Sequence, residues 1–437
     1  MLNYLILKDV PSAGRGRKDA GLYAILAVFY ISLFLARHPV INNIAIVGIF
    51  VYSFFYSSWK ERLASVGRRP ALVFMLAFGL WQLLSFAWSA NRAEASVMLG
   101  MRAPLLIFPL SLGLISIPAW VRNRFLFLMA MVMAMVAIIC FIAAIRNWQN
   151  TGDSGFLYND ALTGILGHQS IYIALLTNLV LFGAGWLLYK KEVPSNLAGW
   201  LWMAILILLP FHFMLASRMA IIVLYAVVGS FVVWQVLSKK MVLEGATLLI
   251  GLLIAGFLLY KFSPKTLNRF RELAYTNYDF KSQAKESHYN GELNAEQWNG
   301  ANIRLAVWEC GKIVGKENLW LGTGIGDKMD ELLKVYASKD FVFGVTTRRN
   351  LHNNYLDAWV TLGLVGLVLL VAGWVILPLI GAVRNGFGWG ALVIIAFACS
   401  YVSETYFDRS IGNVMTGFFI CLALAMAYGK EAKTTTG

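Results

Sequence analysis

The sequence predicts an all-α, polytopic integral membrane protein with about twelve transmembrane helices and one large polar loop. Of its 437 residues, 59% are hydrophobic and only 14% are charged, whereas soluble domains carry roughly 25% charged residues. The apolar residues also gather in runs long enough to cross the ~30 Å hydrocarbon layer of a bilayer as helices. The fold must therefore be stable with lipid as its solvent.

Twelve apolar runs follow one another along the chain. They span residues 21–36, 40–57, 71–89, 102–118, 125–145, 168–189, 197–216, 219–237, 242–261, 355–380, 390–408 and 410–429. Three regions result: residues 1–261 with the first nine helices, residues 262–354 as the large loop, and residues 355–437 with the last three helices. The first run follows some twenty polar residues and lacks a convincing small-x-small cleavage site, so we expect a retained helix and not a cleaved signal peptide.

The distribution of basic residues predicts the orientation of these helices. If the N-terminus is cytoplasmic, every inside connection is basic, as at Lys60/Arg62/Arg68/Arg69 and at Lys190/Lys191, in agreement with the positive-inside rule. Both termini then lie in the cytoplasm and the 262–354 loop lies outside. Much of the net charge of +14 follows from this topology, and because no basic stripe is interleaved with aromatic residues, we expect no nucleic-acid partner.

The large loop is expected to be an ordered cap with short helices. An amphipathic helix is predicted from about Asn302 to Val314, and a second helical pattern runs from Met329 to Tyr336. Between them lies Gly322-x-Gly324-x-Gly326, which resembles a phosphate cradle but lacks the strand and the Lys-Ser/Thr of a P-loop, so we interpret it as a turn. The four cysteines have no C-x-x-C spacing, and we expect neither disulfides nor zinc.

His352 is the first candidate for catalysis. It lies where the loop re-enters the membrane, in the segment Leu351-His-Asn-Asn354, and the two asparagines are suited to cap the tenth helix. A histidine can act as a general base near neutral pH, a role worth about 10²–10⁴ in rate. The alternative is an interfacial histidine without a chemical role.

Arginines near the outer boundary are candidates for binding an anion. Arg218 lies in Ala216-Ser-Arg-Met-Ala220, between two apolar runs with almost no room for a loop. It either snorkels to the surface or meets an anionic ligand such as a lipid-linked phosphate. Arg304, Arg348 and Arg349 would extend a positive basin, because guanidinium groups match phosphate oxygens bidentately; solvated positions are the alternative for these three.

Other polar residues lie near the same boundary. His168, at the outer entrance of the sixth helix, would face the same cavity, and Asn353 would cap the tenth helix or contact substrate. Three carboxylates near the outer boundary, those of Asp357, Glu404 and Asp408, are suited to orient His352 or a sugar hydroxyl. Arg409 follows Asp408 directly. The first outer loop, Ala36-Arg-His-Pro-Val-Ile-Asn-Asn43, lacks the Asp-x-Asp motif of metal-dependent sugar transferases, so we expect no metal site.

Several of these elements together resemble the O-antigen ligase family. They are Arg304 followed by Trp308, Leu321-Gly-Thr-Gly-Ile-Gly326, His352-Asn353 with Gly363 and Gly366, and Arg218 in Ser-Arg-Met-Ala. The resemblance covers the topology of the whole chain and is sharpest over about 210–370. The chain departs from the family pattern Arg-x-x-x-Leu at Trp308.

The resemblance implies a GT-C-like architecture and a glycosyl transfer on the periplasmic face of the bacterial inner membrane. An O-antigen polysaccharide would leave undecaprenyl pyrophosphate and join a sugar hydroxyl of the lipid A-core, with inversion and without metal or cofactor. His352 would be the base, and Arg218 and Arg304 would bind the pyrophosphate.

Two other classes of function stay open on the sequence alone. An O-antigen polymerase or a protein O-oligosaccharyltransferase would share the topology and differ in the acceptor. A lipid-linked glycan transporter or flippase would carry charged residues at mid-membrane depth on several helices, whereas the conspicuous charges here cluster at the outer boundary.

Overall fold

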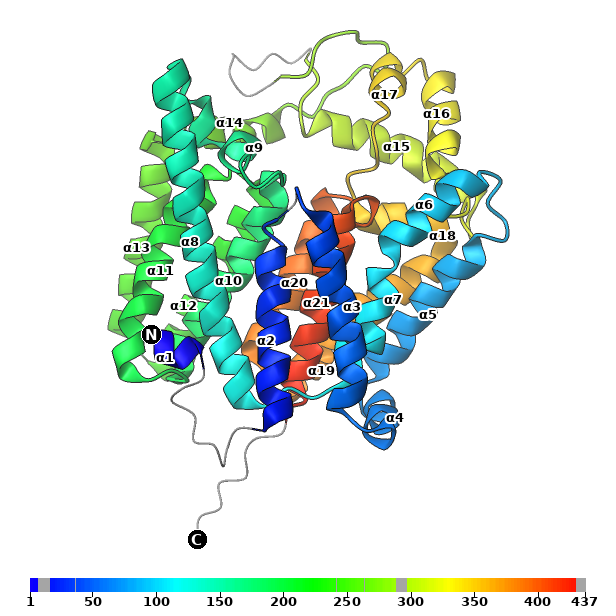
Figure 1. The fold of residues 1–437 in the computed structure, drawn as a ribbon. Coiled ribbons are helices and arrows are strands. Elements are labelled where there is room, and N and C mark those ends of the chain that lie inside the picture. Colours follow the sequence, from blue (N-terminus) through cyan, green and yellow to red (C-terminus); the bar gives the residue numbers. More distant parts are fainter. Residues whose placement is uncertain (7–15, 36, 241, 263, 288–296, 430–437) are drawn as a thin grey trace.

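The computed structural model describes residues 1–6, 16–35, 37–240, 242–262, 264–287 and 297–429. Over these residues the chain is helical, and it contains no named β-strand, only an isolated bridge between Glu286 and Trp298. The long helices form one bundle, with the short helices of the large loop at one end and α4 and the start of α2 at the other (Figure 1). The predicted all-α membrane fold is thus confirmed.

Each of the twelve apolar runs corresponds to helical structure. The elements of the first region are α1 (Leu2–Leu5), α2 (Arg17–Ser32), α3 (Pro39–Tyr56), α4 (Trp59–Arg68), α5 (Pro70–Ser85), α6 (Arg92–Arg102), α7 (Pro104–Leu110), η2 (Leu112–Leu114), α8 (Ala119–Thr151), η3 (Ser154–Leu157), α9 (Asn159–Leu162), α10 (Ser170–Lys190), α11 (Ser195–Met214), α12 (Arg218–Lys239) and α13 (Val242–Phe262). Those of the loop are α14 (Pro264–Arg271), η4 (Glu272–Ala274), α15 (Asn302–Glu317), α16 (Lys328–Ser338) and α17 (Val342–Thr347). The last region holds α18 (Asn354–Val371), the π-helical η5 (Ala372–Ile376), α19 (Leu377–Arg384), α20 (Gly388–Ser403), η6 (Tyr406–Asp408) and α21 (Ser410–Ala427).

The number of helices that qualify as membrane spans depends on the length required. Within the described residues, eight helices are long and apolar enough to cross a bilayer, or nine if the bent pair α4 and α5 counts as one span. The other three predicted spans correspond to α2, α13 and α20; α2 and α20 have 16 residues each, fewer than the ~20 that a perpendicular span requires. The chain is a multi-pass membrane protein.

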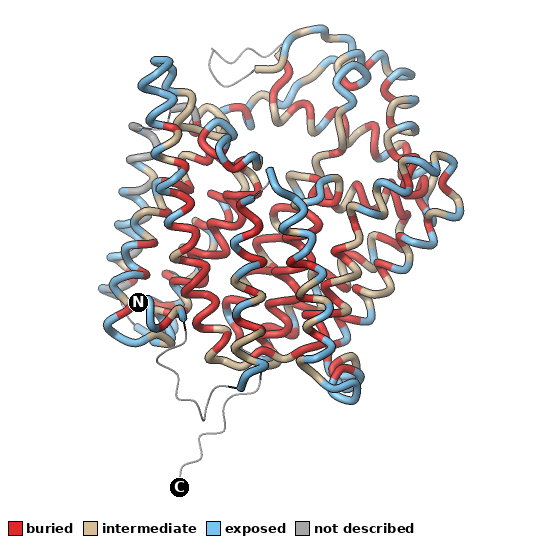
Figure 2. Tube along the Cα trace, in the orientation of Figure 1, coloured by how far each residue is buried: buried red, intermediate tan, exposed pale blue. Residues whose placement is uncertain are grey.

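The centre of the bundle is formed by α10 and α21, whose apolar windows are 78% and 89% buried. Figure 2 shows this buried interior and the exposed outer surface of the peripheral helices. Phe418 of α21 lies among the rings of Phe29, Phe108 and Phe125, with centroids 4.1, 5.7 and 6.3 Å away. Because lipid tails are as apolar as these side chains, close packing of this kind holds the helices together.

The large loop has a hydrophobic core of its own. Trp298, Val307 of α15, Leu332 and Tyr336 of α16, and Phe341 are buried together in it. The predicted apolar face of α15 is confirmed, since its residues Ile303, Ala306, Val307, Cys310 and Val314 are all buried. Over its described residues, the cap is therefore a packed structure.

Helix α18 is interrupted at Gly363, and the interruption connects the cap to the bundle. Gly363 has φ 70°, a conformation that glycine adopts without a Cβ clash. The carbonyl oxygens of Val360 and Thr361 accept hydrogen bonds from the backbone N–H groups of Thr323 and Gly324, at 2.9 and 3.0 Å. The glycine run is thus a turn, as predicted. Its backbone N–H groups at Thr323 and Gly324 satisfy the carbonyls that the interruption of α18 frees, and backbone polar groups at membrane depth need such partners.

Candidate active site

His352 lies between the cap and α18 with its ring against a carboxylate. Its Nδ1 atom is 3.2 Å from Oε1 and 3.3 Å from Oε2 of Glu404, and the two side chains are only 22% and 17% exposed. A carboxylate can only accept hydrogen bonds, so Nδ1 carries the proton in this pair. In the neutral imidazole, Nε2 then has the free lone pair that a general base needs.

The backbone around His352 holds the ring in place. His352 has φ 45°, a left-handed conformation that costs about 1–3 kcal/mol in a residue other than glycine. The Oδ1 atom of Asn350 accepts a hydrogen bond from the His352 N–H at 3.2 Å. Asn353 caps α18, as predicted, because its Oδ1 accepts from the backbone N–H groups of Tyr355 and Leu356 at 3.0 and 2.9 Å.

Glu404 follows the last residue of α20 and stays ionised. Burial by itself raises the pKa of this carboxyl, but the hydrogen bond from His352 and the positive charges of His352 and Arg304 outweigh burial and hold the pKa below its usual value. An Nη2 atom of Arg304 lies 4.0 Å from Glu404 Oε2. The predicted base and one predicted arginine therefore meet at the same carboxylate.

Arg218 and Arg304 come from different elements and converge on Gly300. Arg218 begins α12, and Arg304 lies in the first turn of α15, where its Nε donates to the Ser403 carbonyl at 3.1 Å. A Cβ atom added to Gly300 would lie 2.7 Å from Arg218 Nη2 and 3.2 Å from Arg304 Nη1. The two guanidinium groups thus face one small backbone site, although 86 residues separate them in the sequence.

Two further charged residues, not predicted from the sequence, support Arg218. The Nη1 atom of Arg218 donates to the Arg269 carbonyl at 2.8 Å and lies 3.4 Å from Glu272 Oε2. Arg269 donates in turn to the Ala216 carbonyl at 2.7 Å. Burial raises the pKa of Glu272 despite the positive charges of Arg218 and Arg269.

The charges at this site add up to a positive basin. The arginines Arg218, Arg269 and Arg304 contribute +3, and the carboxylates of Glu272 and Glu404 contribute −2, which leaves +1. An anion with several oxygens would find convergent N–H donors here. Such charge-assisted hydrogen bonds are about twice as strong as neutral ones.

Three of the predicted substrate-binding residues lie in other surroundings. Arg349 forms an ion pair with Glu286 and lies over the Phe343 ring at 5.1 Å. Arg348 is exposed. The ring Nε2 of His168 hydrogen-bonds the Leu33 carbonyl at 2.7 Å, and burial lowers the pKa of His168. No described contact brings these three side chains to His352 or to the arginine pair.

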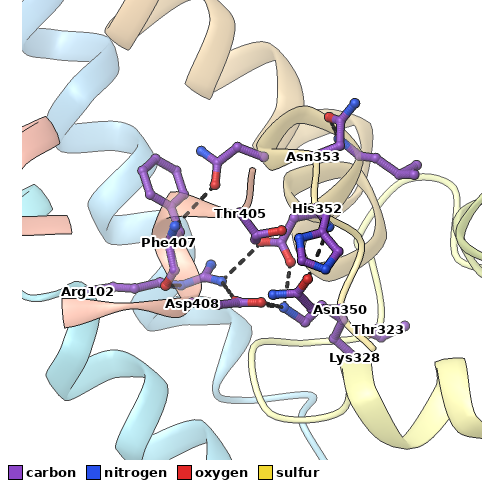
Figure 3. Close-up of polar contacts among 12 residues, drawn as sticks. Arg102, Thr323, Lys328, Asn350, His352, Asn353, Thr405, Phe407 and Asp408 are labelled. Carbon is purple, nitrogen blue, oxygen red and sulfur yellow. Dashed lines mark hydrogen bonds and ion pairs between the residues drawn. The ribbon is translucent and has the colours of Figure 1, made fainter. Parts of the chain in front are cut away.

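A second group of charges lies beside Glu404, and only its acidic members were predicted. Lys328 Nζ of α16 is 2.5 Å from Asp357 Oδ1 and 2.6 Å from Asp408 Oδ2. Arg102 Nη2 of α6 is 3.2 Å from Asp357 Oδ2 and 3.4 Å from Asp408 Oδ1. Figure 3 shows Asp408 between these two cations, with His352 in the same view. Arg409, the other neighbour named from the sequence, is exposed.

Comparison with known families supports the resemblance. The family model described as O-antigen ligase matches residues 202–371. The match covers 170 of the 437 residues, and over this segment the chain is similar to O-antigen ligases. No curated protein matches the sequence. The matched segment contains Arg218, Gly300, Arg304 and His352, while Glu404 lies beyond it.

The similarity gives general support for a membrane enzyme of the O-antigen ligase and polymerase type. Among the residues that the structure describes, no group of three or more His, Cys, Asp or Glu side chains is placed to hold a metal ion. The polar groups that converge at this site are a histidine, a carboxylate and guanidinium groups. These groups are suited to proton transfer and to binding an anionic leaving group.

Proposed function

We propose that this protein is an O-antigen ligase. It would transfer an O-antigen polysaccharide from undecaprenyl pyrophosphate to a sugar hydroxyl of lipid A-core at the periplasmic face of the inner membrane. The observation that carries the proposal is the pair of contacts that joins His352 through Glu404 to Arg304, together with the approach of Arg304 and Arg218 to the same glycine, Gly300. It combines a base with an anion site at the end of the bundle that carries the cap.

In the proposed reaction His352 acts on the acceptor. Its Nε2 takes the proton of the sugar hydroxyl while that oxygen attacks the anomeric carbon of the donor. The bond from the anomeric carbon to the pyrophosphate oxygen breaks at the same time, so the configuration inverts. Glu404 keeps the proton on Nδ1 and stabilises the imidazolium that forms, 3.2 Å away.

In the same step the arginines act on the donor. The leaving undecaprenyl pyrophosphate takes the electron pair of the broken bond and gains negative charge. Preorganised cations near that oxygen stabilise the transition state by several kcal/mol in a poorly hydrated site. Arg218 and Arg304 are already oriented by the Arg269 and Ser403 carbonyls, so little reorganisation accompanies the reaction.

The nearest alternative is a polymerase, in which the acceptor is a second lipid-linked glycan. The same base and the same arginines would serve both reactions, because the donor chemistry is shared. A protein O-oligosaccharyltransferase would use a serine or threonine hydroxyl. A flippase is disfavoured by the position of the clustered arginines, which lie at the start of α12 and in the cap.

The test is transfer by purified protein in nanodiscs. The donor is undecaprenyl-pyrophosphate-linked O-antigen, and the acceptors are lipid A-core, a second lipid-linked glycan and a serine-containing peptide, each offered separately. A ligase forms product with lipid A-core. Product only with the second glycan would assign a polymerase, and product only with the peptide would assign a protein-modifying enzyme.

A further inference from the structure

The buried charges next to Glu404 have no part in the proposed chemistry. Arg102, Lys328, Asp357 and Asp408 come from α6, α16, α18 and η6, four elements far apart in the sequence. Their side chains are at most 11% exposed. Two cations and two carboxylates balance to zero, so the group is an internal salt-bridge network.

Such a network needs a reason beyond stability. Removing charges from water costs several kcal/mol per ion, and well-packed apolar residues are often equally stable in their place. What the network does provide is geometry, because both carboxylates are shared between the same two cations. Asp408 accepts from Lys328 with both oxygens, at 2.7 and 2.6 Å.

The network fixes the segment that carries Glu404. This segment, Glu404–Asp408, connects α20 to α21. Arg102 Nε donates to the Phe407 carbonyl at 3.2 Å, and the Phe407 N–H donates to Asn354 Oδ1 at 3.1 Å. The segment is thus held at its distal end by the cluster, while Glu404 at its near end bonds His352.

We infer that Lys328 is a positioning residue: through Asp408 it connects the cap to the Glu404–Asp408 segment and sets the position of Glu404 against His352. Lys328 is the first residue of α16, whose Leu332 and Tyr336 are buried in the cap core. It is the one member of the cluster that belongs to the cap. The cap therefore contributes to catalysis through an ion pair that contacts neither substrate.

This inference rests on the proposed function of His352 and Glu404. A misplaced Glu404 would weaken proton transfer in the transition state and leave ground-state binding of both lipids intact. Lys328→Met should therefore lower kcat by roughly 10–100-fold, the loss expected when a catalytic group shifts by about 1 Å. The KM values for donor and acceptor should stay within twofold of wild type.

Three variants separate positioning from folding. Lys328→Met leaves two carboxylates with one cation, which can destabilise the protein by itself. Lys328→Met combined with Asp357→Asn restores the balance of one cation and one carboxylate, so thermal stability should recover while kcat stays low. Lys328→Arg should restore kcat at least in part, because it can reach both carboxylates. The control is Lys334→Met, a 69% exposed lysine of the same helix paired with Glu331.

Steady-state transfer and thermal unfolding of these variants in nanodiscs decide the matter. A low kcat in the charge-balanced double variant, with recovered stability and unchanged KM values, supports the inference. Wild-type kcat in Lys328→Met, or full recovery of kcat in the double variant, would overturn it. If His352→Ala kept full activity, the proposed function itself would fail, and that outcome does not depend on Lys328.

Discussion

Replacing Glu404 by glutamine tests the geometry of the proposed base. The amide keeps the size of the side chain but loses the charge, and it no longer favours the proton on Nδ1 of His352. The imidazolium that forms during transfer would lie about 3.2 Å from the carboxylate in the wild type. At an effective dielectric constant of 20, that attraction is about 5 kcal/mol.

The net effect is smaller than this attraction. Arg304 competes for the same carboxylate at 4.0 Å, and both partners are partly exposed. If half of the attraction is realised, the loss is about 2.5 kcal/mol, which corresponds to roughly 10²-fold in kcat. The KM for the lipid-linked donor should change little.

The assay is single-turnover transfer from undecaprenyl-pyrophosphate-linked glycan to lipid A-core, with the variant compared to wild type and to Glu309→Gln. Glu309 is a 45% exposed carboxylate of the cap and pairs with Lys339, so its loss should leave kcat unchanged. A Glu404→Gln variant that folds and transfers at the wild-type rate would refute the role assigned to the His352–Glu404 pair.

Three further predictions concern the anion site, the broken helix and metal dependence. Gly300→Val should raise the donor KM about tenfold, because the new side chain displaces two guanidinium groups. Hydrogen bonds to charged groups contribute roughly 1.5–3 kcal/mol each. An unchanged KM in a donor titration would contradict the anion site. Gly363→Ala should lower the thermal unfolding temperature, because its Cβ would overlap the Trp320 carbonyl and because residue 363 has a positive φ. An unchanged unfolding curve in nanodiscs would argue against the interruption of α18 at Gly363. EDTA should leave kcat unaltered, and loss of activity restored by added Mg²⁺ would show that a metal takes part.

The fold could be predicted from the sequence because lipid leaves few choices. A backbone that crosses a bilayer must satisfy its own polar groups, so long apolar runs become helices. The amphipathic helix that begins at Asn302 could also be predicted, since its apolar residues repeat with helical period. The number of spans was less certain, because α2 and α20 have only 16 residues each.

The candidate site could be predicted only in part. His352, Arg218 and Arg304 stood out by position and by resemblance. The structure brings His352 and Arg304 to the same carboxylate, and Arg218 and Arg304 to the same glycine. Glu404 was one of three carboxylates considered, and no local pattern distinguished it from Asp408. Only the three-dimensional approach of α20 to the cap places it against the histidine.

Arg348 and Arg349 were predicted to bind substrate because they lie close to His352 in the sequence. Both precede His352 closely, but Arg348 and His352 have left-handed backbone conformations, with φ 46° and 45°. Arg349 pairs with Glu286. Lys328 was missed for the opposite reason, because its partner Asp408 lies 80 residues away and spacing gives no signal.

The central claim is that this protein transfers a glycan from a lipid pyrophosphate with His352 as its base. The most direct measurement is transfer from undecaprenyl-pyrophosphate-linked O-antigen to lipid A-core by purified wild type, His352→Ala and His38→Ala in nanodiscs. His38 is an exposed histidine at the start of α3 and serves as the matched control. We expect wild type and His38→Ala to form product equally and His352→Ala to lose at least about 10²-fold in rate. A folded His352→Ala variant with wild-type activity would contradict the account.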